Sequence, residues 1–241
     1  MEFHGQVIAV CGVDNAFGWG MVDTLLQLGA RTVVAIGDPG SGASIGNAAE
    51  QTDRAGRGEL VCLPDDVLDR PADMAARLGE HGTIDAAINL VPLSPPADDA
   101  GGDFVARRTR HVLGAIKGFL RTKQPHGALV NVGWWSPGAD GSLAAEAAAA
   151  AGSLELLTKL LAKELAPDIR VNAVLAMAVP SAEPKALAER APEDIAIRLE
   201  EAAGPALFLA SAAARHMTGS VLLADAGRSL GFTAFSSKNE S

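Results

Sequence analysis

LLTKLLAKELAPDIRVNAV, residues 156–174, joins the end of a long helical pattern to a short run rich in β-branched residues. The same alternation recurs along the whole chain. Strands are predicted at 6–11, 31–36, 59–63, 84–89, 127–132, 168–174 and 220–225, and helices at 18–28, 43–54, 70–80, 103–123, 142–165 and 192–211. Because strands that alternate with helices usually pair in parallel, the pattern predicts an α/β fold with a doubly wound parallel sheet.

The composition indicates a single domain over residues 1–241, with a polar tail at 233–241 that we expect to be frayed. Hydrophobic residues make up 48% of the chain and aromatic residues only 4%, which predicts an aliphatic core. The net charge of −9 argues against a nucleic acid or an anionic membrane as partner. Without a basic leader or a membrane-spanning apolar run, the sequence predicts a cytoplasmic protein. Cys11 and Cys62 fall in predicted strands, so we expect both to be buried and reduced.

The turn after the first predicted strand has the composition of a nucleotide-binding loop. Residues 11–18 read CGVDNAFG, in which Gly12 and Gly18 allow backbone N–H groups and a helix N-terminus to approach a phosphate. Ala16 occupies the middle position, where its methyl group would crowd the phosphates. A tight turn without a ligand explains the same glycines equally well, so both interpretations stay open.

Longer segments carry a family resemblance. Residues 156–174, and residues 216–227 with the sequence HMTGSVLLADAG, resemble the sixth helix and strand and the last strand and turn of short-chain dehydrogenases/reductases. The loop at 11–18 resembles the Thr-Gly-x-x-x-Gly-x-Gly motif of that family, and the resemblance extends over nearly the whole chain. It implies a Rossmann-like, three-layer α/β/α domain with seven parallel strands in the order 3-2-1-4-5-6-7.

The resemblance also implies a dinucleotide site. Asp66 in DDVLD matches the Asp that contacts adenine, and Asn89 in NLVP stands in the family's Asn-Asn-Ala-Gly motif, where Pro92 replaces the glycine. Asp38 follows the second predicted strand, where a carboxylate binds a ribose 2′-hydroxyl and favours NAD(H) over NADP(H). An exposed turn aspartate accounts for Asp38 as well. Together with the loop glycines, we expect these residues to hold NAD(H) weakly or not at all.

The family's catalytic residues have no counterpart in this chain. The family uses a Tyr as general acid/base and a Lys four residues later to lower its pKa, but this chain contains no tyrosine. The resemblance places that Tyr at Ala147, the Lys at Ala151, the catalytic Ser at Trp134 and the helical Asn at His111. Two alanines and a tryptophan supply no acid or base, so carbonyl reduction by this chain alone is not expected. No spacing of potential ligands indicates a metal site.

These observations favour a non-catalytic subunit that assembles with a catalytically intact relative as a dimer or tetramer. Helices 103–123 and 142–165 correspond to those that form the family's four-helix subunit interface, and the alanine run at 144–151 suits close packing there. Some members of the family are hetero-oligomers of an active and a degenerate subunit. One such pair oxidises a hydroxyacyl-CoA in anaerobic toluene degradation.

Two other interpretations stay open. An enzyme with repurposed chemistry, such as a lyase, cyclase or dehydratase, would depend on His111 or on Asp98 and Asp99. A sensor that binds NAD(H) without turnover would respond through the tryptophans beside the predicted nucleotide cleft, which include Trp19. The same indole rings could instead fill an empty pocket, because a large void is destabilising.

Overall fold

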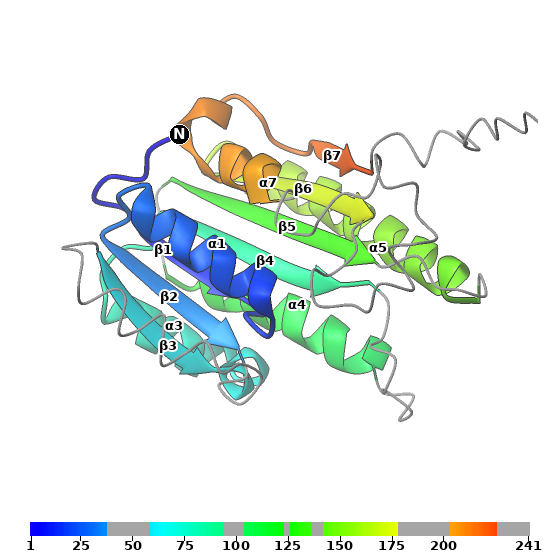
Figure 1. Cartoon of the computed structure of the whole chain (residues 1–241), viewed down its shortest axis with the longest axis horizontal. Helices are drawn as coiled ribbons and strands as arrows, with labels where there is room; N and C mark the ends of the chain where they lie inside the picture. The colour runs from blue at the N-terminus through cyan, green and yellow to red at the C-terminus, as the bar shows by residue number, and fades with distance from the viewer. Residues whose placement is uncertain (38–57, 94–103, 123–125, 136–141, 178–202, 226–241) are drawn as a thin grey trace, which may run out of the picture.

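The computed structural model describes residues 1–37, 58–93, 104–122, 126–135, 142–177 and 203–225. At its centre is a seven-stranded sheet in the order β3-β2-β1-β4-β5-β6-β7 (Figure 1). Every neighbouring pair of strands is parallel. The strands are β1 (Val7–Cys11), β2 (Thr32–Gly37), β3 (Glu59–Pro64), β4 (Ala86–Pro92), β5 (Gly127–Trp135), β6 (Ile169–Met177) and β7 (Val221–Ala224). The predicted Rossmann-like fold and strand order are confirmed.

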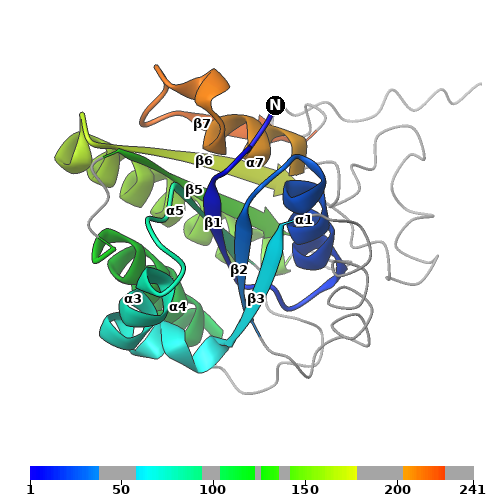
Figure 2. The same ribbon diagram turned by 90° about the vertical axis from the view of Figure 1, so that its left-hand side faces the viewer.

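Helices cover both faces of the sheet, as Figure 2 shows end-on. One face carries α1 (Ala16–Gln27) and α7 (Ala203–Ala210), and the other carries η1 (Asp65–Asp69), α3 (Pro71–Gly79), α4 (Phe104–Leu120) and α5 (Ser142–Leu165). A short 3-10 turn, η3 (Ala212–Ala214), follows α7. Within the described parts of the chain, no helix is both long enough and apolar enough to cross a membrane.

The strand sequences follow from this double coverage. In β1, Ile8 and Val10 pack into the core beneath α1 and α7, whereas Val7, Ala9 and Cys11 pack into the core beneath α3, α4 and α5. All five residues are buried. Central strands buried on both faces therefore appear in the sequence as continuous apolar runs rather than as alternating patterns.

Two expectations about the strands need correction. Cys11 is buried as expected, and burial raises the pKa of its thiol to about 12. Cys62 is exposed, because β3 is the edge strand of the sheet. Strand β5 also continues past its predicted end, because Trp134 pairs with Pro92 of β4 and Ala176 of β6.

Three predicted segments lie outside the described residues: the helix at 43–54, residues 192–202 of the last predicted helix, and the tail at 233–241.

Arg170 in β6 links α7 to the sheet through hydrogen bonds. Its guanidinium group donates hydrogen bonds to the backbone carbonyls of Leu209 at 2.9 Å and Ala214 at 3.0 Å, and to those of Ser211, Ala210 and Met217 at 3.3–3.4 Å. Carbonyls at the end of a helix have no partner within the helix, and a cation there also interacts favourably with the helix dipole. One partly buried side chain thus satisfies the C-terminal end of α7 and the turn after it.

We predict that Arg170→Met lowers the free energy of unfolding by about 2–3 kcal/mol, because several buried carbonyls lose a charged donor. Urea denaturation followed by circular dichroism measures the difference. Arg77→Met, at an exposed position of α3, serves as the control and should change stability by less than about 0.5 kcal/mol. Equal effects of the two substitutions would show that the cap does not stabilise the fold.

Candidate functional site

The candidate site lies at the carboxyl ends of the strands, where ligands bind in doubly wound sheets. The β1–α1 turn reaches this edge and is held by β2, because the amides of Gly12 and Val13 both donate to the Ile36 carbonyl, at 2.8 and 3.0 Å. Asn15 caps α1, and its side-chain oxygen accepts a hydrogen bond from the Gly18 amide at 3.1 Å. One of the amides expected to face a phosphate is therefore already paired within the chain.

The predicted phosphate-loop glycines are required by the turn itself. Gly12 has a φ of +81°, and a Cβ there would lie 2.5 Å from the carbonyl oxygen of Leu90 in β4. A Cβ on Gly18 would lie 2.9 Å from the Cα of Val13. A Cβ on Gly37 would lie 2.4 Å from the carbonyl oxygen of Val13. Contacts this short exclude a side chain, so the glycine pattern is explained without a ligand. Ala16 begins α1.

A pocket of about 290 Å³ opens beside this turn, at the ends of β2 and β3. Its lining is almost wholly apolar and consists of Val13, Trp19, Ala35, Gly37, Cys62, Leu63 and Pro64. Trp19 is 8% exposed, and its indole Nε1 is buried without a hydrogen-bond partner. Trp19 and Val13 on the β1–α1 side and Leu63 and Pro64 of β3 face each other across this pocket. Asp38, the expected ribose ligand, lies outside the described residues.

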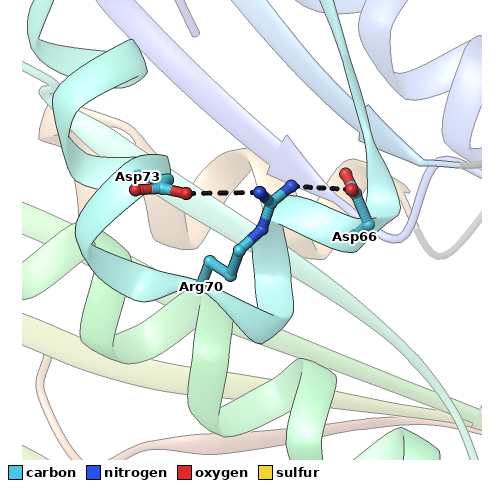
Figure 3. A network of polar contacts seen from close by, with 3 residues as sticks. All are labelled: Asp66, Arg70 and Asp73. Carbon is cyan, nitrogen blue, oxygen red and sulfur yellow. Dashed lines mark hydrogen bonds and ion pairs between the residues drawn. The ribbon is translucent and has the colours of Figure 1, made fainter.

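Asp66, the expected adenine contact, lies in η1 and takes part in a local ion-pair network. Figure 3 shows Arg70 between two carboxylates, 2.7 Å from Asp66 and 3.4 Å from Asp73. All three side chains are more than half exposed, so the pairs add little stability. The carboxylate of Asp66 points to Arg70, four residues further along the chain. This ion pair explains the position of the Asp66 side chain without a nucleotide.

Asn89 belongs to a buried hydrogen-bond chain. Its side-chain amide donates to Asn131 Oδ1 in β5 at 3.3 Å, and Asn131 Nδ2 donates to Thr158 Oγ1 in α5 at 3.1 Å. Asn131 and Thr158 are fully buried, and Asn89 is 3% exposed. The chain joins β4, β5 and α5, so Asn89 has a structural role in addition to any contact with a cofactor.

The four positions assigned to the family's catalytic residues lie on α4, β5 and α5. Ala147 is buried and Ala151 is partly buried on α5, and the partly buried Trp134 packs against the core on the α1 side of the sheet. His111 is partly buried on α4, and it forms no hydrogen bond or ion pair with another described residue. It is the only titratable group of the four. In the described segments, no group of His, Cys, Asp or Glu is arranged to hold a metal ion.

Arg108 is a cation near this edge that the sequence analysis did not identify. Its Nη1 lies 3.4 Å from the carbonyl oxygen of Leu93, the residue after β4, and its guanidinium carbon lies 5.7 Å from the ring centroid of Phe104. Partial burial lowers its pKa. The four-residue spacing of Phe104 and Arg108 on one helix was the signal that could have shown the pairing. Asp98 and Asp99 lie outside the described residues.

Comparison with known proteins places these features in context. The sequence model of the family described as enoyl-(acyl carrier protein) reductase matches residues 12–229. No curated protein matches the chain. A short-chain dehydrogenase/reductase from Mycobacterium ulcerans is 20% identical, with a TM-score of 0.78 over 95% of this chain and 92% of that one.

Two further solved structures are similar. A putative short-chain dehydrogenase/reductase from Burkholderia xenovorans is 25% identical, with a TM-score of 0.72 over 95% of this chain and 98% of that one. A 3-oxoacyl-[acyl-carrier protein] reductase from Brucella melitensis, solved with bound NAD, is 22% identical, with a TM-score of 0.73 over 91% of this chain and 89% of that one. These neighbours share the fold.

We predict that Gly12→Ala destabilises the ligand-free protein by at least about 1–2 kcal/mol, because alanine is strained at a positive φ and its methyl group would overlap the Leu90 carbonyl. Gly20→Ala is the matched control, because Gly20 lies in α1 and a Cβ added there would have no atom within 4 Å. That substitution should stabilise the protein by about 0.5–1 kcal/mol. Urea unfolding of both variants tests whether the turn itself requires Gly12. A Gly12→Ala protein as stable as the wild type would show that it does not, and ligand binding would then explain the glycine.

Proposed function

The chain belongs to the short-chain dehydrogenase/reductase family, and we propose that it is a non-catalytic subunit that assembles with a catalytically intact dehydrogenase of that family. The absence of tyrosine carries this proposal. In this family a Tyr hydroxyl exchanges the proton with the substrate oxygen, and general acid/base catalysis typically contributes a factor of about 10²–10⁴. A chain with no tyrosine has no such group at any alignment.

The assigned register supports the same conclusion from a second direction. At the proposed Tyr and Lys positions, Ala147 and Ala151 present only methyl groups, and at the proposed Ser position Trp134 presents an indole. An indole N–H can donate a hydrogen bond but cannot act as a base near neutral pH. His111 alone retains a titratable group, and a single imidazole does not replace the Tyr-Lys pair.

The outer surface of α4 and α5 is the proposed contact with the partner. Both helices lie on the same face of the sheet, and their solvent side exposes Val105, Leu113, Leu156 and Leu160, each between 37% and 59% exposed. We call this surface the α4–α5 layer. Exposed apolar side chains gathered on neighbouring helices are typical of protein contact surfaces. By analogy with the family's hetero-oligomers, a hydroxyacyl-CoA dehydrogenase is one candidate for the active partner.

We predict that purification of the chain from its native host yields a second short-chain dehydrogenase that carries Tyr-x-x-x-Lys in equal amount, identified by mass spectrometry. The double variant Leu156→Asp and Leu160→Asp should release the partner, because it buries two charges in the contact. Leu223→Asp, at an equally exposed leucine of β7 outside the layer, should retain it. Recovery of the wild type as a homo-oligomer without a second dehydrogenase would refute the proposal.

Binding of NAD(H) without turnover is a second candidate function, and the apolar pocket beside Trp19 favours it. We propose that this apolar pocket would take the adenine ring. Ala147 and Ala151, at the positions assigned to the family's Tyr and Lys, would not hold the nicotinamide ribose. As a subunit without its own chemistry, the chain would then bind the cofactor weakly.

We predict that NADH quenches the tryptophan emission of the isolated chain with a dissociation constant no tighter than about 1 mM, which corresponds to about −4 kcal/mol. Trp19→Phe should remove most of the response, because Trp19 lines the pocket, whereas Trp135→Phe should retain it. Micromolar affinity would contradict weak binding and support a nucleotide sensor.

A further inference from the structure

We infer that the pocket beside Trp19 takes an uncharged, flat heteroaromatic compound of the nucleoside class, and that phosphate groups on such a compound do not strengthen its binding. This inference rests on the second candidate function, which assigns the pocket to the adenine ring. It changes the class of ligand from a dinucleotide held by its phosphates to a ring compound held by its base.

The lining and the size of the pocket favour a flat ring. The residues that line it carry no charge, and Trp19 on one side faces Leu63 and Pro64 of β3 on the other. An indole offers a large planar surface on which another ring can stack. The volume of about 290 Å³ lies at the lower end of the range for small-molecule sites, which is about 300–1,000 Å³. The pocket therefore has room for a ring system rather than for a whole dinucleotide.

Trp19 supplies a hydrogen-bond donor that has no acceptor. The residue is 8% exposed, and among the described residues its Nε1 is the one buried side-chain nitrogen or oxygen without a partner. An unpaired buried donor is destabilising, and a ring nitrogen of a bound base can accept its hydrogen bond. Because Nε1 is closed to water in the ligand-free pocket, the acceptor would reach it through a rotation of the indole about χ2, which has a broad minimum in aromatic side chains.

The β1–α1 turn offers little to a phosphate. The amides of Gly12 and Val13 both donate to the Ile36 carbonyl, and the Gly18 amide donates to Asn15 Oδ1. These three N–H groups are paired within the chain before any ligand arrives. A phosphate that binds one of them would have to replace an existing hydrogen bond, so its net gain is small.

The surroundings of the pocket also lack a cation for a phosphate. The three segments that form the turn and the pocket contain no Lys or Arg: residues 1–30, 32–37 and 59–64. Arg70, which follows β3, is already ion-paired with Asp66 and Asp73. With a net charge of −9, the chain as a whole repels an anion. Binding at this pocket therefore depends on the ring and on Trp19, and added phosphates bring no advantage.

The two cysteines provide a direct readout of the pocket. Cys62 is exposed and lines the pocket, whereas Cys11 is buried and its thiol pKa is raised to about 12. Because the thiolate is the species that reacts, iodoacetamide at mildly alkaline pH should label Cys62 and spare Cys11. A ring in the pocket covers Cys62 and slows its alkylation, which mass spectrometry of the labelled peptide measures. Alkylation of Cys11 would report an unfolded chain.

Adenosine and ADP are the first probes, because they differ only in the 5′-diphosphate. We expect adenosine to protect Cys62, with half-protection at a concentration no higher than ADP requires. Half-protection by ADP at a concentration at least about 10-fold lower, which corresponds to about 1.4 kcal/mol, would overturn the inference. An alkylation rate that adenosine leaves unchanged up to its solubility limit would overturn it as well.

Three deaza analogues of adenosine test the Trp19 donor. Each replaces one ring nitrogen, N1, N3 or N7, with a C–H group that accepts no hydrogen bond. We expect one of the three to require about 5-fold more ligand than adenosine for the same protection, the size of one hydrogen bond. Trp19→Phe should bind adenosine and this analogue equally. Trp135→Phe, in which the altered residue packs against the core on the other face of the sheet, should retain the difference.

The role of Trp19 is refuted if the wild type binds all four compounds equally, or if Trp19→Phe keeps the difference while its Cys11 stays unlabelled. The outcomes also separate this inference from the second candidate function. If NADH protects Cys62 and adenosine does not, binding of NAD(H) stands and the nucleoside preference fails. If neither compound protects Cys62, both fail, and assembly with a dehydrogenase is still tested by copurification.

Discussion

The structure depends on the close approach of the β1–α1 turn to the strands on both sides of it. Gly12 lies against the Leu90 carbonyl of β4, and the turn amides are bound by Ile36 of β2. This contact fixes where α1 starts, and through α1 it places Trp19 against β2 and β3. A side chain on Gly12 would push the turn away from β4, and a side chain on Gly18 would push α1 away from Val13 of the turn. The glycine motif is therefore evidence for this fold first, and for a bound nucleotide only second.

The fold and the family's catalytic chemistry depend on different residues. The fold is carried by continuous apolar strands, helix caps and close backbone contacts. Catalysis in this family depends on a few side chains at the end of β5 and on α5. Ala147 and Ala151 disturb neither the helix nor the core, because alanine is the best helix former. The alanines at the positions assigned to the family's Tyr and Lys are therefore compatible with the fold.

The sequence predicted the strands because the central strands are buried on both faces and form unbroken apolar runs, and the family resemblance supplied their order. It did not predict that Cys62 is exposed, because exposure depends on the position of β3 at the sheet edge. It also missed the role of Arg170, whose carbonyl partners lie 39 to 47 residues further along the chain. The apolar pocket is lined by residues from three separate segments of the chain. Local sequence patterns do not predict how such segments pack together.

The hydrogen-bond chain from Asn89 through Asn131 to Thr158 has a mechanical consequence for assembly. Thr158 lies on the inner side of α5, two residues from Leu156 and Leu160 on its outer side. The helix cannot shift along the sheet without breaking the buried hydrogen bond between Thr158 and Asn131. A contact that holds α5 in place therefore also stabilises its connection to β5 and β4. A subunit seated on α5 would thereby slow the opening of strands it never touches, and backbone amide exchange in β4 and β5 would report its arrival.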